Sequence, residues 1–448
     1  MTLTPETNRL ALRGDLLDFS AAPGWGELES AAVRFQPDSW LLIENGRIVG
    51  TQSAAPDASW QQQDHSGRLI LPGFIDTHVH CPQLDVIASY GTELLDWLER
   101  YTFPAECRYA DPVVAASGAA RFLDALLAHG TTSAVVFPTV HKASVEALFE
   151  AAAARGMRLI TGKVLMDRNA PPALLDDPDD VAGAERDCID LISRWHGQGR
   201  LAYAVTPRFA PTSSPAQLAM AGALCRADDS LYMQTHVAEN RAEVRWVAEL
   251  FPEARSYLDV YARVGLLHPR ALLAHCIWLD EEDKRVLAAS GAQVAFCPSS
   301  NLFLGSGLFD WPAARAAGLA VSVASDVGGG TSLSLQRNLL DGYKVQALLG
   351  HRLSAWAGLH AATRGAAEAL GLAQEIGHFG VGTLADVCVW DWAVGPVAEA
   401  RDAVVRSLHE RVFAWMALSD ERNLVASYVA GHPRFIRAQL LRSQDSSD

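Results

Sequence analysis

Four histidines and one aspartate stand at, or just after, the ends of short apolar runs in the sequence: His78, His80, His236, His275 and Asp326. Imidazole and carboxylate ligands suit Zn, and also Fe or Mn. His78 and His80 are two residues apart on a segment that we expect to be extended, so both rings point to the same face. With a third histidine and Asp326 they complete three nitrogens and one oxygen around a divalent ion, and a water takes the open position.

Such an ion lowers the pKa of its bound water toward ~7, so that hydroxide is available at neutral pH. Glu239 follows His236 by three residues. A carboxylic acid there can protonate a ring nitrogen while hydroxide attacks the adjacent carbon, which is worth ~10²–10⁴ in rate. Asp326 can accept the proton of the bound water, and His275 can orient the hydroxide. Without His236 nearby, a surface loop carboxylate would be the simpler interpretation of Glu239.

The elements that must position these residues alternate along the chain. Short β-branched or apolar runs are separated by Ala/Leu-rich helical segments such as 115–129 and 144–155. Eight such strands predict a (β/α)₈ TIM barrel, in which the chemistry lies at the C-terminal ends of the strands. A doubly wound open sheet is the structural alternative. The eight predicted strands are 69–76, 131–137, 158–164, 201–206, 231–236, 271–275, 293–297 and 319–325.

The two ends of the chain have a different pattern. Residues 40–50 (WLLIENGRIVG) are two apolar runs around Asn-Gly, a strong signal for a two-residue hairpin. Residues 384–390 and 424–431 are further short apolar runs. We therefore expect a small β domain formed by both ends. The predicted division is 1–70 for its first part, 71–377 for the barrel and 378–448 for its second part.

Composition excludes several classes of protein. The chain has 448 residues, 49% of them hydrophobic, and a net charge of −15. This is a globular composition, and an acidic chain gives no reason to expect a nucleic acid or an anionic membrane as partner. Seven cysteines without a C-x-x-C motif predict a reducing compartment. With no apolar stretch of ~18 residues and no secretory leader pattern, we expect a cytoplasmic protein.

Two further signals have simpler structural interpretations. The run Gly328-Gly329-Gly330 is not part of a phosphate-binding G-x-x-x-x-G-K-[S/T] motif, so we expect a tight turn or a close backbone approach. Cys81 adjoins His80, and we expect its side chain to point away from the two histidines into the core. The H-x-E and P-C-x-x-C pair of the small α/β zinc deaminases is absent from the sequence.

The motifs resemble those of a known superfamily. The run PGFIDTHVH at 72–80 looks like the first-strand signature of the amidohydrolase superfamily. The runs CPQLD at 81–85 and YTFPAE at 101–106 are similar to its guanine deaminase branch. The resemblance spans roughly 70–375. Further matching runs are TPRFAP at 206–211, QTHVAEN at 234–240, PSSNLFLGSG at 298–307 and SDVGGG at 325–330.

The resemblance implies hydrolysis of guanine to xanthine and ammonia by a zinc-bound hydroxide, in a homodimer with one Zn per subunit. By the same resemblance His275, Glu239 and Asp326 are the catalytic residues. The metal ligands it implies are His78, His80, His236 and Asp326, and the residues that hold the purine are Gln83, Arg208 and Phe209 together with His236 and Glu239. Gln and Arg offer several donors to ring atoms, and Phe offers a flat face for stacking.

Two alternatives stand beside this interpretation, and the role of one segment is open. A related barrel deaminase for another purine, a pterin or a triazine would not require Gln83, Arg208 and Phe209. The simpler structural interpretations are a barrel-rim salt bridge for Arg208 and plain core for Phe209. A non-catalytic scaffold predicts lost ligands, whereas all are present. Trp97 and Phe103, in the 94–106 segment, either line a lid over the metal or pack as a loop helix.

Overall fold

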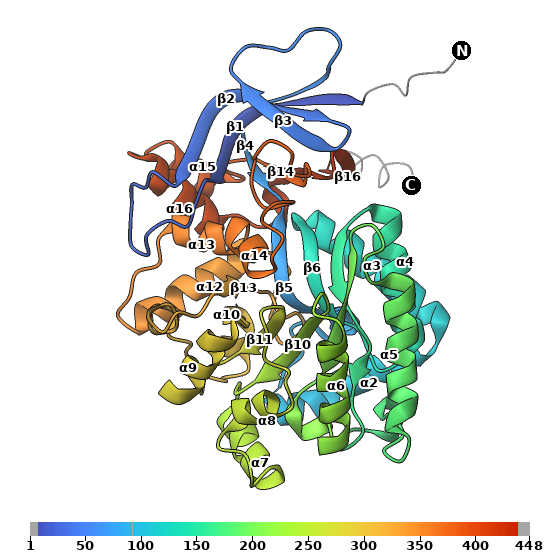
Figure 1. Ribbon diagram of the computed structural model, residues 1–448. Helices are drawn as coiled ribbons and strands as arrows, with labels where there is room; N and C mark the ends of the chain where they lie inside the picture. The colour runs from blue at the N-terminus through green and yellow to red at the C-terminus, as the bar shows by residue number, and fades with distance from the viewer. Residues whose placement is uncertain (1–7, 92, 438–448) are drawn as a thin grey trace, which may run out of the picture. The chain divides into compact units, whose positions relative to one another are not determined.

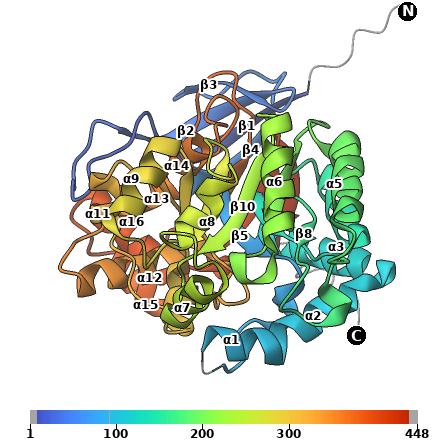
Figure 2. The ribbon, with the colours of Figure 1, turned by 60° about the horizontal axis from the view of Figure 1, so that its bottom comes forward.

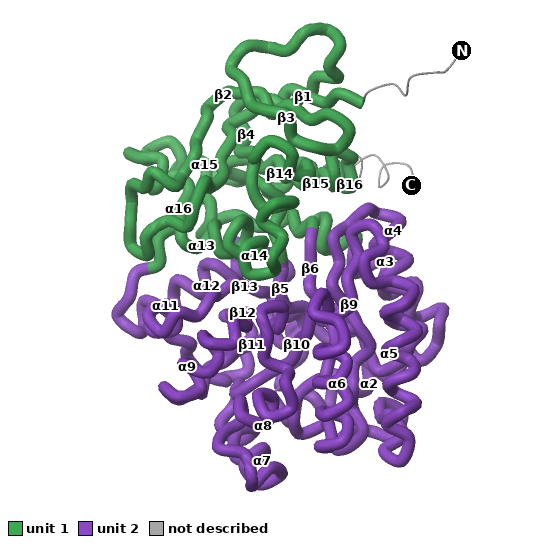
Figure 3. The backbone as a smooth tube through the Cα atoms, viewed as in Figure 1, with its two compact units in different colours: residues 1–75, 124–132, 353–448 green, residues 76–123, 133–352 purple. Residues whose placement is uncertain are grey.

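The computed structural model describes residues 8–91 and 93–437 (Figure 1). The chain divides into two compact units, shown in green and purple in Figure 3. Unit 1 comprises 1–75, 124–132 and 353–448, and unit 2 comprises 76–123 and 133–352. The three-part division at 70/71 and 377/378 stays a prediction.

A nearly closed barrel of eight strands confirms the predicted fold class. Its strands follow the order β13-β12-β11-β10-β9-β7-β6-β5, and a short ninth strand, β8, pairs with β9. The recorded pairs within this sheet are parallel, as expected for strands joined by helices. The strands are β5 (Phe74–His80), β6 (Thr131–Phe137), β7 (Arg158–Thr161), β8 (Val164–Leu165), β9 (Leu201–Pro207), β10 (Tyr232–Val237), β11 (Ala271–His275), β12 (Gln293–Phe296) and β13 (Val321–Val323).

The predicted bounds of the first barrel strand, 69–76, are wrong, because only 74–76 of them belong to it. Leu69 to Pro72 are the end of β4 (Gln61–Pro72), which pairs with β14 (Val387–Trp390) in another sheet. The barrel strand β5 begins after Gly73 and continues to His80. A side chain at Gly73 would meet Thr132, since an added Cβ would lie 2.2 Å from its Oγ1. The apolar run is continuous in sequence, but the chain passes between sheets at this glycine.

Helices follow most barrel strands, and α3 and α4 confirm the helices expected at 115–129 and 144–155. Figure 2 shows α2 and α7 at the same end of unit 2. The helices are α1 (Leu94–Trp97), α2 (Phe103–Cys107), α3 (Pro112–Ala128), α4 (Lys142–Arg155), α5 (Val181–Trp195), α6 (Pro215–Ala227), α7 (Arg241–Leu250), α8 (Tyr257–Arg263), α9 (Glu281–Ser290), α10 (Pro298–Phe303), α11 (Trp311–Ala316), α12 (Leu335–Leu348), α13 (Ala355–Ala361), α14 (Arg364–Ala369), α15 (Pro396–Asp402) and α16 (Leu408–Leu418).

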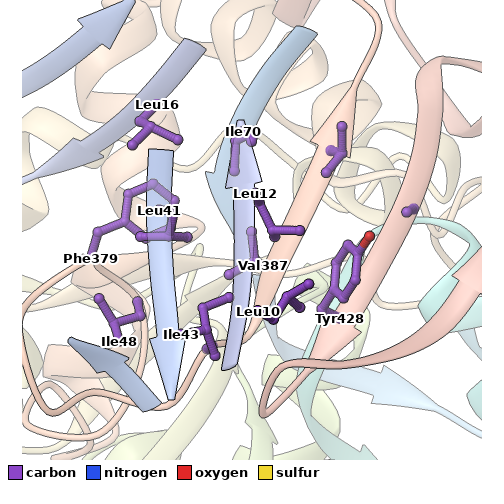
Figure 4. Close-up of a cluster of buried hydrophobic side chains, with 13 residues drawn as sticks. Leu10, Leu12, Leu16, Leu41, Ile43, Ile48, Ile70, Phe379, Val387 and Tyr428 are labelled. Atoms are coloured by element: carbon purple, nitrogen blue, oxygen red, sulfur yellow. The ribbon is translucent and has the colours of Figure 1, made fainter. Parts of the chain in front are cut away.

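The terminal strands form one mixed sheet, as expected. Its order is β16-β15-β14-β4-β1-β2-β3. The predicted hairpin is present between β2 and β3, because Asn45 (φ 52°) and Gly46 (φ 77°) take the left-handed conformations of its two-residue turn. Figure 4 shows the apolar cluster of this sheet, to which Leu12, Leu41 and Val387 belong. The other strands are β1 (Arg9–Phe19), β2 (Val33–Glu44), β3 (Arg47–Gln52), β15 (Leu424–Val429) and β16 (His432–Ile436).

Within the described residues, no helix combines the length and the apolar character that crossing a membrane would require.

Candidate active site

Four of the predicted residues form a buried group that can hold a metal ion: His78, His80, His236 and Asp326. The Nε2 atoms of His78 and His80 lie 3.3 Å apart, and those of His80 and His236 lie 3.2 Å apart. Asp326 Oδ1 lies 3.2 Å from His78 Nε2 and 3.3 Å from His80 Nε2. Ligand atoms of a tetrahedral ion with bonds of ~2.0–2.1 Å are separated by roughly 3.3 Å. The observed distances therefore fit one shared first-row divalent ion.

The protonation of the histidines also fits a metal. The Nδ1 atom of His236 donates to the carbonyl oxygen of Arg208 at 2.7 Å, so Nε2 of the neutral ring carries the lone pair. Burial lowers the pKa of His80 to about 3 and that of His236 well below its usual value. A cation between the facing ring nitrogens would bind their lone pairs, which agrees with the ligand distances.

Strand ends position the group as expected for a barrel. His78 and His80 end β5 with both rings on one face, His236 stands near the end of β10, and Asp326 follows β13. His275 and Asp326 have left-handed backbones, with φ of 69° and 48°. Such conformations are costly for residues other than glycine and gather at functional sites. Here they turn each side chain at the end of its strand.

The glycine run after Asp326 is a tight turn with close backbone approaches, as predicted. The N–H of Gly330 donates to the carbonyl oxygen of Asp326 at 2.6 Å. A Cβ atom at Gly330 would lie 1.8 Å from the carbonyl oxygen of Ser325, and one at Gly328 would lie 2.5 Å from that of Gln83. Only glycine fits these two positions. Cys81 is buried and lies outside the metal-binding groups found among the described residues.

His275 and Glu239 lie beside the metal-binding group. His275 Nε2 is 3.4 Å from Glu239 Oε2 and 3.7 Å from Asp326 Oδ2. The other ring nitrogen, Nδ1, donates to Oδ1 of Asn301 at 2.8 Å. Ser306 donates its hydroxyl to Glu239 Oε1 at 2.8 Å. The structure thus gives both groups a fixed orientation toward one another.

The loop that carries Glu239 is anchored by the helix that follows it. Glu243 Oε2 accepts the backbone N–H groups of Glu239 at 2.9 Å and of Asn240 at 3.0 Å, as part of the capping box of α7. Burial, together with the nearby charge of Asp326, raises the pKa of Glu239 to about 8. Glu239 therefore carries a proton at neutral pH and can act as an acid.

One pocket joins the metal-binding group to the predicted purine-binding residues. Gln83, Arg208 and Phe209 are 2%, 3% and 5% exposed, so none of them belongs to an open barrel rim. Arg208 forms a buried ion pair with Glu106. The pocket is lined by His80, Gln83, Leu94, Trp97, Leu98, Arg208, Phe209, His236, Glu239, Glu243, His275, Leu304, Asp326 and Gly329.

The 94–106 segment is packed, and Trp97 lines the pocket whereas Phe103 does not. Leu94 and Trp97 of α1 line the pocket, and Leu98 follows them. Trp97 and Phe103 are also members of a buried apolar cluster. The segment is a packed wall of the pocket, and the cluster that holds it also contains barrel residues such as Phe137 and Val164.

Glu106, Asn301 and Ser306 contact the predicted site residues and were not predicted to take part. A signal existed for Asn301, because it lies just beyond the seventh barrel strand, where barrels place functional residues. Glu106 is a carboxylate in the apolar and aromatic run YTFPAE, which is a weaker signal for a buried charge.

Comparisons with known proteins agree with this geometry. Residues 69–433 match the model of the amidohydrolase family. The chain belongs to the amidohydrolase family. Its buried group of three histidines and one aspartate is the metal-binding group typical of amidohydrolases.

Among relatives, guanine deaminase of Escherichia coli K12 is 42% identical over 94% of this chain and 96% of its own length. The solved structure of E. coli guanine deaminase superimposes with a TM-score of 0.91 at 41% identity, covering 96% of this chain and all of that one. A guanine deaminase from C. acetobutylicum, solved with guanine bound in its active site, superimposes with a TM-score of 0.85 at 26% identity and covers 96% of this chain and all of that one.

Proposed function

We propose that this amidohydrolase hydrolyses guanine to xanthine and ammonia. The observation that carries the proposal is the placement of Gln83 and Arg208 in the same buried pocket as the metal-binding group. An amide and a guanidinium offer donors and an acceptor to the edge of a purine that bears ring nitrogens and a carbonyl oxygen. The similarity to guanine deaminases over nearly the whole chain supports the same substrate.

The resident ion of the proposal is one Zn²⁺ per subunit, with Fe or Mn as alternatives. His78, His80, His236 and Asp326 would hold it, since neutral imidazoles and a carboxylate suit these metals. When bound, the ion lowers the pKa of a coordinated water to ~7 and so supplies a nucleophile at neutral pH.

Three side chains move or hold protons in the proposed reaction. Glu239, protonated at neutral pH, delivers a proton to the ring nitrogen beside the amino-bearing carbon and assists departure of ammonia. Asp326 accepts a proton through Oδ2, the oxygen that faces His275 at 3.7 Å. His275, oriented by Asn301, accepts a hydrogen bond at Nε2 from the attacking oxygen.

The remaining pocket residues hold the ring. Gln83 and Arg208 hydrogen-bond its polar edge, and Phe209 packs against it together with the apolar wall of Leu94, Trp97 and Leu98. Enclosure of the ring excludes bulk water. A buried polar site of this kind rejects analogues that lack a partner group by ~10⁴.

The deciding experiment follows guanine loss by ultraviolet absorbance, with adenine, cytosine, a pterin and a triazine in parallel, before and after chelation. Turnover of guanine alone, abolished by chelation and restored by Zn²⁺, is the expected result. If another ring is turned over and guanine is not, the assignment of the metal-binding group still holds. The assignment of Gln83 and Arg208 as guanine-binding residues is then wrong.

We also propose a cytoplasmic homodimer. All seven cysteines are free, which agrees with a reducing compartment. The dimer rests on the resemblance to guanine deaminases alone. Light scattering during size-exclusion chromatography measures it directly, and a single species at the mass of one chain contradicts it.

A further inference from the structure

Glu106 lies behind the two side chains that are proposed to bind the polar edge of the ring. It belongs to α2 and is 0% exposed. Its Oε1 accepts from Arg208 Nη1 at 2.8 Å and from Gln83 Nε2 at 3.2 Å, and its Oε2 accepts from the same Nη1 at 2.6 Å. Gln83 and Arg208 line the pocket, whereas Glu106 does not. Glu106 therefore acts on a ligand through these two residues and through its charge, not by direct contact.

Glu106 and a backbone amide fix the orientation of the Gln83 side chain. Gln83 donates from Nε2 to Glu106, and its Oε1 accepts the N–H of Gly328 at 3.1 Å. A side-chain amide can rotate by half a turn and exchange its oxygen and nitrogen. A carboxylate accepts and an N–H donates, so only one of the two orientations satisfies both partners. Gln83 thus presents one remaining N–H in a fixed direction.

Arg208 is held in a similar way. Glu106 occupies Nη1, while Nε and Nη2 make no hydrogen bond within the part of the chain that the structure describes. The guanidinium also lies over the ring of Phe103, with Cζ 5.4 Å from the ring centroid. The backbone carbonyl of Arg208 accepts from Nδ1 of the metal-binding His236. One residue therefore links the purine-binding edge to the metal-binding group, and Glu106 holds its side chain.

The pair also sets the charge of the pocket edge. A buried guanidinium without a counter-charge would favour an anionic ligand, because water screens it little. We propose that Glu106 is a positioning residue that fixes the donors of Gln83 and Arg208 and cancels the charge of Arg208, so that the pocket selects an uncharged ring over an anionic one. The inference rests on the proposed function: guanine is neutral, whereas xanthine has a more acidic ring N–H and ionises in mildly alkaline solution. Glu106 then also limits inhibition by the product.

The test is E106Q with bound metal. The amide introduced by this substitution offers one acceptor oxygen, so Gln83 or Arg208 loses a partner, and the positive charge of Arg208 is no longer cancelled. KM for guanine is expected to rise at least ~10-fold with a much smaller change in kcat. Inhibition by xanthine is measured from mildly acidic to alkaline pH. In the wild type it weakens as xanthine ionises, and in E106Q it strengthens.

Two variants complete the experiment. E106D keeps the charge and both oxygens, so the pH dependence of its inhibition by xanthine should follow that of the wild type. Its KM for guanine should lie between those of the wild type and E106Q. D283N is the matched control, because Asp283 is also buried, is paired with Arg255 and lies outside the pocket. It should leave KM and the xanthine profile unchanged. Thermal melting and metal content confirm that each variant is folded and loaded.

The outcomes separate the two proposals. If the wild type does not turn over guanine, the proposed function is wrong. A wild type active on guanine, with KM and xanthine inhibition unchanged in E106Q, overturns the role of Glu106 alone. If E106Q does not fold, E106D decides: a raised KM at nearly unchanged kcat supports the inference, and a wild-type KM overturns it.

Discussion

Nε2 of His275 lies 3.4 Å from Oε2 of Glu239, and both residues lie beside the group formed by His78, His80, His236 and Asp326. Because His275 Nδ1 donates to Asn301, Nε2 of the neutral ring is an acceptor. Glu239 is protonated at neutral pH, since burial and Asp326 raise its pKa to about 8. An acid and an acceptor therefore face one another at the edge of the metal-binding group.

Glu239→Gln should keep the metal and lose turnover. The amide preserves the size of the side chain and can still accept from Ser306, but it has no acidic proton to give to the ring. We expect kcat to fall by ~10²–10⁴. Steady-state kinetics and metal analysis of the same preparation measure both quantities. E249Q is the control, because Glu249 is exposed on α7. Near wild-type turnover in E239Q would refute the role of Glu239.

The pH profile should show the acid directly. With a pKa of about 8, Glu239 loses its proton as pH rises through that value, so kcat/KM should be sustained at neutral pH and fall above about 8. The hydrogen bond from Ser306 favours the charged form and lowers this pKa. In S306A the decrease in kcat/KM should therefore occur at a higher pH. If the decrease occurs at the same pH as in the wild type, a group other than Glu239 titrates there.

The barrel and the metal-binding group could be predicted from the sequence because their signals are local. His78, His80 and Asp326 follow apolar runs that predict strands. Parallel barrel strands place their C-terminal ends together, so this rule alone predicts that the three residues lie close to one another. The boundary at 69–76 could not be predicted in the same way. Leu69 to Pro72 are as apolar as the barrel strand after them, and only pairing with β14, more than 300 residues away, separates them.

The hydrogen-bond and ion-pair partners of the site residues are also harder to predict, because they too lie far away in the sequence. The Glu106–Arg208 pair joins positions 102 residues apart. The apolar and aromatic run YTFPAE is only a weak signal that its carboxylate is buried, and it does not indicate a partner. The resemblance located Arg208, but the carboxylate that pairs with it could be identified only in the folded structure.

Removal of the metal should lower stability as well as activity. An ion that binds only the folded state stabilises it by about 2.7 kcal/mol when its free concentration is 100 times its Kd. Chelation is therefore expected to lower Tm and abolish turnover, and Zn²⁺ should restore both. In H80A, which lacks one ligand, Tm should no longer respond to chelator. H432A, altered at an exposed histidine of the terminal sheet, should respond like the wild type. Equal responses from H80A and the wild type would place the metal elsewhere.

Asn301→Ala should slow the reaction without releasing the metal. Asn301 touches His275 through the ring nitrogen that faces away from Glu239, and His275 lies outside the group of His78, His80, His236 and Asp326. Without this partner the ring can turn, and its other tautomer places a proton on Nε2, where an acceptor is required. We expect kcat to fall by ~10–100-fold, the range typical of groups that orient residues around a metal site. S299A is the matched control on the same helix, because Ser299 bonds to Thr331 instead. Loss of metal from N301A, or equal kinetics for the two variants, would show that Asn301 supports the fold and not His275.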